Sequence, residues 1–190
     1  MNGAASLVLG QYETTTIWVK NGAWHADTGG GVIGAEVVAK STLAAAIADT
    51  PNSRPLVYII KHRDTDLVPG SGGNYHYKTS EPSHAAKFQN GAGDWYELIT
   101  AEPWLEQFGG KGNNIADNTP PYNDAIAYAV LHGDTLSCGP GVFRIDSHPD
   151  AITEKLKIIG RGYSDTIWRR NYASGGGNTS CLIRTIYPGL

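Results

Sequence analysis

The sequence predicts a mainly β protein, in which a small N-terminal α+β or β-rich module precedes a helix and a series of short strands. The chain of 190 residues contains 24 glycines and 10 prolines, and most of its β-branched and aromatic runs are short. Frequent turn residues between such runs, with few stretches long enough for a helix, are typical of β-rich chains. We divide the chain into residues 1–39, 40–100 and 101–190.

The first segment is expected to contain strands and a linker. The run Thr14–Val19 is β-branched and aromatic, and Asn21-Gly22 after it favours a tight hairpin turn. The return strand should therefore start at Ala23. Gly29–Gly31 is expected to be a flexible joint or turn, and Val32–Ala39 a further strand.

The second segment is expected to be a small α+β module. Ser41 is a plausible N-cap for a short alanine-rich helix over Thr42–Asp49, and Pro51 would stop that helix. Its inner face should carry Leu43, Ala46 and Ile47. The expected strands of this segment are Leu56–Ile60, which resembles a buried strand, Tyr75–Lys78 and Trp95–Ile99.

An amphipathic helix is the clearest feature of the third segment. Thr119 is the expected N-cap, and Pro120 takes the first helical position, where a missing N–H costs nothing. Gly133 is the expected C-terminal stop. The apolar stripe at helical spacing consists of Tyr122, Ala125, Ile126, Ala129 and Val130.

Only short strands separated by turns are expected after this helix. A helix followed by such a series suggests a capped solenoid, because the terminal turn of a solenoid has no neighbour to cover its core. The strands are expected at Thr135–Cys138, Val142–Ile145, Leu156–Ile159, Thr166–Trp168 and Cys181–Arg184.

Several motifs in this segment resemble those of pectate-lyase-like β-helix proteins, over about residues 104–190. Gly139–Ile145 resembles the Pro-x-Gly-x-Tyr-x-Ile strand of that family, and Leu156–Gly162 with Thr166-Ile167 resembles the next coil. The resemblance implies a helix-capped start of a right-handed parallel β-helix. The family's opening motif, whose role is structural, falls on Phe108, Gly109, Lys111, Gly112, Asp117, Thr119, Ala125 and Ile126.

The opening motif departs from the family pattern at three positions that matter here. Gly110 stands for Ala, Asn113 for Asp, and Asn118 for the second Asp of Asp-Asp-Thr. Asn can cap a helix or form a turn as Asp does, so the fold should be unchanged. The lost carboxylates weaken the case for a metal ion at this loop.

The resemblance also implies a function, that of the N-terminal part of a bacteriophage tailspike. Such a protein would be a homotrimer, made in the host cytoplasm and carried on the tail of the virion. Residues 1–100 would dock to other tail or baseplate proteins, and a part beyond Leu190 would attach to host surface polysaccharide and could be a depolymerase. Two alternatives are a truncated polysaccharide lyase or hydrolase of the same family outside phage, and a stand-alone tail adaptor.

Charge and composition argue against several other classes. A formal charge of −3 creates no field that would gather nucleic acid, and no stretch reaches the roughly 18 apolar residues of a membrane span. Cys138 and Cys181 lie in apolar runs and are expected to be buried free thiols. The six histidines include no pair at close metal-ligand spacing, and we expect neither a metal nor a cofactor.

Saccharide cleavage generally needs two carboxylates about 5–10 Å apart on a rigid surface. The acids of the third segment form no recognisable pair, so we expect them to be solvated or capping groups and assign no catalytic residue. Trp104 and Phe108 should pack in the neck between the second and third segments. The acids are Asp117, Asp124, Asp134, Asp146, Asp150, Glu154 and Asp165.

Overall fold

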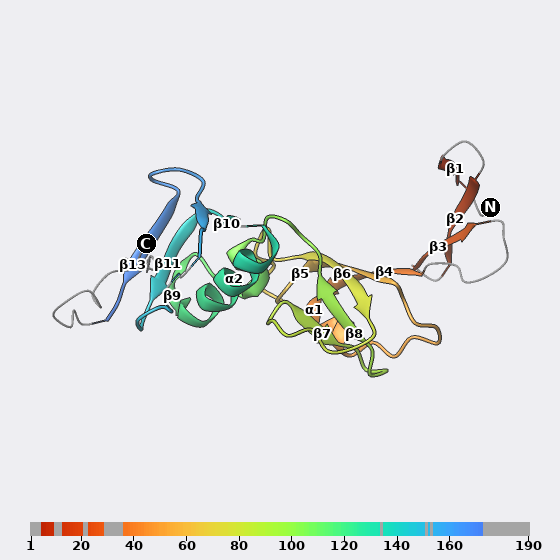
Figure 1. The fold of residues 1–190 in the computed structure, drawn as a ribbon, viewed down its shortest axis with the longest axis horizontal. Coiled ribbons are helices and arrows are strands. Elements are labelled where there is room, and N and C mark those ends of the chain that lie inside the picture. Colours follow the sequence, from red (N-terminus) through yellow and green to blue (C-terminus); the bar gives the residue numbers. More distant parts are fainter. Residues whose placement is uncertain are drawn as a thin grey trace.

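The computed structural model describes the backbone of residues 5–9, 13–20 and 23–28, and residues 36–133, 135–150, 152 and 154–172 in full. These residues are mainly β, as the sequence predicts. Strands β1–β3 lie at one end of an elongated molecule and β13 at the other (Figure 1). Residues 36–100, here called the central module, lie between them.

The N-terminal strands form an antiparallel meander of β1 (Ala5–Leu9), β2 (Glu13–Lys20) and β3 (Ala23–Thr28). The expected β2–β3 hairpin is confirmed, whereas β1 was not predicted. The pairing of Trp24 with Val37 joins β3 to the central module. The predicted turn at 21–22, the joint at 29–31 and the start of the strand at 32–39 lie outside the described residues.

The central module is an open sheet with the strand order β4-β5-β6-β8-β7. The parallel pair β4 and β5 is connected through helix α1, and the other pairs are antiparallel. Its elements are β4 (Val37–Thr42), α1 (Leu43–Ile47), β5 (Val57–His62), β6 (Gly73–Lys78), β7 (Lys87–Gln89) and β8 (Trp95–Leu98). This part thus combines one short helix with a sheet, and β7 is the strand that the sequence did not reveal.

Helix α1 is shorter than predicted and begins one residue later. Its N-cap is Thr42 rather than Ser41, because the Thr42 hydroxyl accepts a hydrogen bond from the amide of Ala45 at 3.2 Å. Ala46 is buried, but Ile47 is 46% exposed, so the prediction for Ile47 was wrong. Leu43 and Ala46 are buried, whereas Ile47 is the last residue of the helix and its side chain stays largely outside the core.

Aromatic rings form the core of the central module. Tyr58 meets Tyr96 edge to face with 4.7 Å between ring centroids, and Phe88 stacks on Tyr96 at 5.2 Å. The buried Tyr58 hydroxyl donates to a carboxylate oxygen of Asp49 at 2.7 Å, which ties the end of α1 to β5. Burial and this bond fix the sheet against its short helix.

Helix α2 (Thr119–His132) has Asn118 at its N-cap, one residue before the predicted Thr119. The helix ends at Gly133 as expected, and the Gly133 amide donates to the carbonyl of Ala129 at 3.0 Å. The predicted stripe is buried except for the partly buried Val130, and it also includes a buried residue that was not predicted, Tyr128.

The remaining strands pair in parallel, and we call them the strand stack. One sheet contains β9 (Asn113–Asp117), β11 (Gly141–Ile145) and β13 (Thr166–Arg170). A second contains β10 (Thr135–Ser137) and β12 (Lys157–Ile159), and Trp104 bridges to Ser137 in the same sense. The strand expected at Cys181–Arg184 lies outside the described residues.

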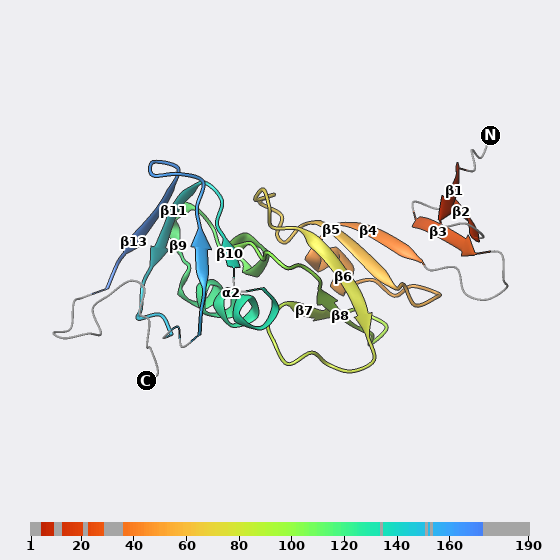
Figure 2. The same cartoon turned by 45° about the horizontal axis from the view of Figure 1, so that its top comes forward.

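Two elements of this part were not predicted. The 3₁₀ helix η1 (Leu105–Phe108) precedes the glycines at 109, 110 and 112, and β9 begins at Asn113, where no strand was predicted. Helix α2 lies between the strand stack and the central module in both views (Figures 1 and 2). The buried apolar residues of the two parts form one connected cluster. None of the described helices is both long and apolar enough to pass through a membrane.

Candidate functional site

The residues of the opening motif meet where α2 contacts the strand stack. Their hub is Asn118, whose side chain is fully buried. Its amide nitrogen contacts the carbonyls of Lys111, Ala116 and Arg144 at 3.0–3.2 Å, and its oxygen accepts from the Lys111 amide at 2.7 Å. A carboxylate could not donate to these carbonyls, so the departure from Asp to Asn has a structural reason.

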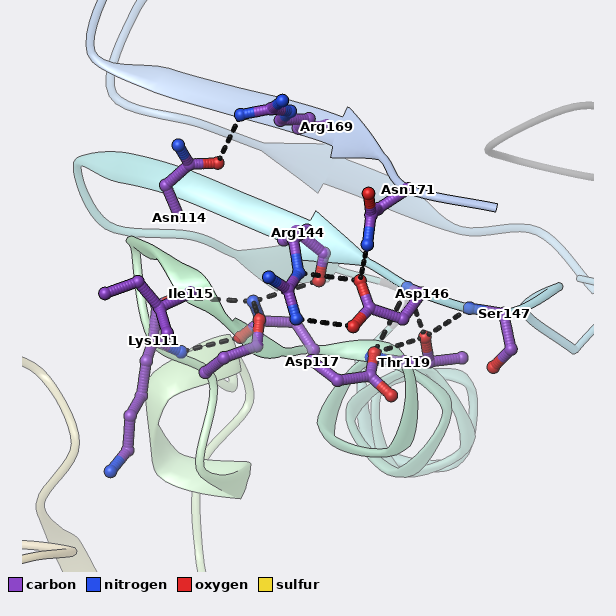
Figure 3. Close-up of polar contacts among 12 residues, drawn as sticks. Lys111, Asn114, Ile115, Asp117, Thr119, Arg144, Asp146, Ser147, Arg169 and Asn171 are labelled. Carbon is purple, nitrogen blue, oxygen red and sulfur yellow. Dashed lines mark hydrogen bonds and ion pairs between the residues drawn. The ribbon is translucent and has the colours of Figure 1, made fainter. Parts of the chain in front are cut away.

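Thr119 and Asp117 clamp the start of α2 to the end of β11 (Figure 3). The Thr119 hydroxyl donates to Asp117 at 2.6 Å and accepts from the amides of Asp146 and Ser147 at 3.1 and 3.2 Å. The Thr119 side chain thus serves a neighbouring strand, which explains why it does not cap its own helix. The amide of Thr119 also donates to Asp117 at 2.8 Å.

The electrostatic environment of Asp117 favours its ionised form. Burial acts to raise the pKa of this carboxyl, but the hydrogen bonds from Thr119 and Asp146, together with the nearby Arg144, outweigh it. The net result is a pKa below the usual range of an aspartate. Arg144 in turn forms a two-pronged pair with Asp146, at 2.7 and 2.6 Å.

The glycines of the motif allow close approach between chains. A side chain on Gly112 would lie 2.7 Å from the Pro140 carbonyl and 2.9 Å from Gly141, so only glycine fits here. Gly109 ends η1 with a φ of 97°, a conformation that glycine adopts without strain. Lys111 reaches the central module and pairs with Asp66 at 2.7 Å, an exposed contact of small energetic weight.

The apolar members of the motif fill the space under α2. Phe108, Ala125 and Ile126 are buried, and the Phe108 ring contacts that of Tyr128 at 5.6 Å. Trp104 is partly buried with the Arg161 guanidinium over its ring at 4.7 Å. The polar residues and glycines of the motif thus have contacts or close approaches to the strands, the helix or the central module, and its apolar residues are buried.

Hydrogen bonds between buried or partly buried groups attach this region to the central module. Arg63 donates to the carbonyl of Gln107 at 2.6 Å, and the Gln107 side chain donates to Gly72 at 2.7 Å. The buried Tyr128 hydroxyl donates to the carbonyl of Leu98 at 2.6 Å. Sequence analysis missed these residues, since spacing along the chain says nothing about such distant partners.

Glu106 is a buried carboxylate at the same junction. Its Oε1 accepts from the Gly139 amide at 2.8 Å, while Oε2 has no hydrogen-bond partner among the described residues. Burial raises its pKa above the usual range, although its own amide, that of Gly139 and the charge of Arg161 act in the opposite direction. Burial likewise raises the pKa of the free thiol of Cys138, to about 12.

The acids of the strand stack have individual structural contacts. Asp117 accepts from the Thr119 amide, Asp146 pairs with Arg144, and the main-chain amide of Asp150 donates to the side-chain oxygen of Asn123 at 3.0 Å. Burial raises the pKa of Asp124, with Asp150 adding to the effect and Arg63 opposing it. Asp134 lies outside the described residues.

A separate group of side chains could hold a metal ion. His84, Glu97 and His132 come from a loop, from β8 and from α2, and one ligand atom of each lies within 4.8 Å of the others. Lys78 contacts the other oxygen of Glu97 at 2.6 Å. No local spacing in the sequence could have revealed this group, because each residue lies on a different element.

No model of a known protein family matches the chain, and the search of curated proteins finds no match either.

Proposed function

We propose that this chain is the N-terminal virion-anchoring and neck region of a phage tailspike or tail fibre that attaches to host surface polysaccharide. One observation carries the proposal: helix α2 covers a set of parallel strands that recur along the chain. Thr135 pairs with Lys157, and Gly141 with Thr166. These separations of roughly 20–30 residues fall within the range of solenoid repeats.

The pairing pattern supports the start of a right-handed parallel β-helix. Each passage of the chain adds one strand to the β10–β12 sheet and one to the β9–β11–β13 sheet. Parallel crossovers within one sheet are almost always right-handed. The buried stripe of α2 supplies the cover that the first coil of a solenoid requires.

The contacts between the central module and the region that starts at Trp104 support a rigid connection between an anchoring part and the β-helix. Arg63, Gln107 and Tyr128 bind the central module to the neck through contacts of 2.6–2.7 Å, so the two parts share one connected core rather than a loose linker. In this proposal residues 1–100 dock to other tail or baseplate proteins. The polysaccharide contact belongs to a region beyond Leu190.

The outer surface of the strand stack offers apolar area for a homotrimer. Ile115 on β9 is 72% exposed and Ile167 on β13 is 44% exposed, while Val142, the register partner of Ile167, is half-buried. Exposed apolar side chains grouped on one sheet are typical of subunit contacts. Three copies arranged in a closed ring would bury them.

The oligomeric state is the first test. Analytical ultracentrifugation of the 190-residue chain should give three times its 20.3 kDa mass. Replacing Ile115 and Ile167 by lysine should dissociate the trimer, whereas Ile47→Lys, which alters an exposed isoleucine on α1, should not. A monomeric parent chain would contradict the trimer.

The virion location needs its own experiment. Antibodies raised against the chain should label the tail end of phage particles released by cells that carry the gene, in immunogold electron microscopy. Absence of label from such particles would overturn the anchoring role. Turnover of pectin or capsular polysaccharide by the 190-residue chain would favour a polysaccharide lyase or hydrolase instead.

A further inference from the structure

Two imidazoles and a carboxylate converge where the last turn of α2 contacts the central module. His84 lies in the loop between β6 and β7, Glu97 on β8, and His132 near the end of α2. The side chains of His84 and Glu97 are only 7% and 10% exposed, and that of His132 is 31% exposed. The group is therefore mostly buried, and His132 is its most exposed member.

The distances fit a small divalent cation after minor side-chain movement. The Nε2 atoms of His84 and His132 lie 2.6 and 3.8 Å from the same oxygen of Glu97. Bonds of about 2.0–2.1 Å in a tetrahedral zinc site place neighbouring ligand atoms about 3.3 Å apart. The distance from His84 to Glu97 must lengthen and the distance from His132 to Glu97 must shorten, each by less than about 1 Å.

The hydrogen bonds of His132 orient its free nitrogen toward Glu97. Its Nδ1 lies 2.9 Å from the carbonyl of Tyr128, which can only accept, so Nδ1 carries the proton. The imidazole also stacks on the Tyr128 ring at 4.0 Å. In the neutral imidazole the Nε2 lone pair then faces the Glu97 carboxylate, an arrangement that a cation bound between them would stabilise.

Glu97 is held as a ligand through one oxygen. Lys78 contacts Oε2 at 2.6 Å, which leaves Oε1 directed at both imidazoles. Such a partner on the far oxygen fixes the orientation of a coordinating carboxylate. The carboxylate is therefore ionised and positioned before any metal arrives.

We propose that His84, Glu97 and His132 form a zinc site that joins the central module to α2. Two imidazole nitrogens and one carboxylate oxygen suit zinc better than calcium or magnesium, which prefer oxygen ligands. The site does not depend on the phage proposal, since it rests on side chains that any role would leave in place.

Zinc binding changes the proton position on His84. In the metal-free chain the Ala86 amide donates to Nδ1 of His84 at 3.2 Å, so the proton lies on Nε2 and is directed at Glu97. Coordination through Nε2 requires the other tautomer, with the proton on Nδ1. The Ala86 amide then loses its acceptor and exchanges its hydrogen faster when zinc is bound.

Calorimetric titration of the full chain with zinc chloride tests the site directly. We expect one high-affinity ion per chain, a raised midpoint of thermal unfolding, and no comparable response to magnesium. His132→Ala and His84→Ala should each weaken binding by at least about tenfold. His148→Ala, which alters an exposed histidine between β11 and β12, should leave binding unchanged.

Two further variants at His132 distinguish the loss of a zinc ligand from a folding defect. His132→Glu offers a carboxylate ligand of similar reach and should retain binding, whereas His132→Gln should lose it. Circular dichroism establishes that each variant folds. Absence of zinc binding by the parent chain, or binding that survives the His84→Ala and His132→Ala double variant, would overturn the site.

Discussion

The side-chain amide of Asn118 donates a hydrogen bond to the carbonyl of Arg144 at 3.2 Å, from a position with no solvent exposure. This contact joins the N-cap of α2 to the end of β11. The same nitrogen also reaches the carbonyls of Lys111 and Ala116. One buried amide thus organises the loop, the helix and the first paired strands.

Asn118→Asp should be severely destabilising at pH 7, although it restores the residue that the family motif carries. The carboxylate would face three carbonyl oxygens in a buried position, and an uncompensated buried charge costs about 3–5 kcal/mol. Urea unfolding measures the loss, and acid should recover part of it because a protonated Asp donates one hydrogen bond. Asn114→Asp, at an exposed position on β9, is the matched control and should stay within about 0.5 kcal/mol of the parent.

Two buried tyrosines on α2 should respond differently to loss of their hydroxyl groups. Tyr128→Phe removes the donor to the Leu98 carbonyl and should cost about 1–2 kcal/mol. The Tyr122 hydroxyl is buried and has no hydrogen-bond partner among the described residues, so Tyr122→Phe should be neutral or slightly stabilising. Equal losses in thermal unfolding would contradict the assigned role of Tyr128.

Asp117 should make the fold sensitive to acid. Its pKa is lowered in the folded chain, so its contribution is complete above the unfolded value of about 3.9 and is lost as the pH falls through the folded value. Asp117→Ala should cost about 0.5–2 kcal/mol at pH 7, as for a lost helix cap, and progressively less below about pH 4. Chemical unfolding between pH 3 and 7 measures the trend, and Glu154→Gln, at an exposed position, serves as the control.

Glu106 should have the opposite pH dependence. Its folded pKa is raised, so its contribution is most favourable below the unfolded value of about 4.3 and declines as the pH rises toward the folded value. Glu106→Gln removes this dependence. The free energy of unfolding of Glu106→Gln relative to the parent should therefore increase between pH 4 and 7, and a flat or falling difference would refute the assigned pKa direction.

Local chemistry along the chain predicted most elements but misplaced some boundaries. The alternating apolar residues of β5 and β11 and the stripe of α2 were identified, since their periods depend on neighbours in sequence. Ser41 and Thr119 were both wrongly expected as N-caps. Thr119 shows why, because its hydroxyl binds the amide of Asp146, a partner that only the folded chain brings near.

The resemblance singled out the residues of the opening motif, but the contacts that each of them makes were not visible in the sequence. The close Pro140 carbonyl leaves room only for glycine at position 112. Asn118 is required because its amide contacts carbonyls that come before α2 in the chain and one that comes after it. The close approaches that require these residues form only when the parallel strands stack. Sequence could therefore indicate where the motif lies, and the structure supplied the contacts that explain it.

By itself, the sequence determined the mainly β character, the helix α2 with its stop at Gly133, and the series of short strands, because turn chemistry and periodicity act over a few residues. Only the tertiary structure decided that Arg63 meets Gln107 and that His84, Glu97 and His132 share one place. These partners lie on separate elements, and no rule of local spacing brings them together. Their meeting depends on how the sheet, the helix and the strand stack pack on one another.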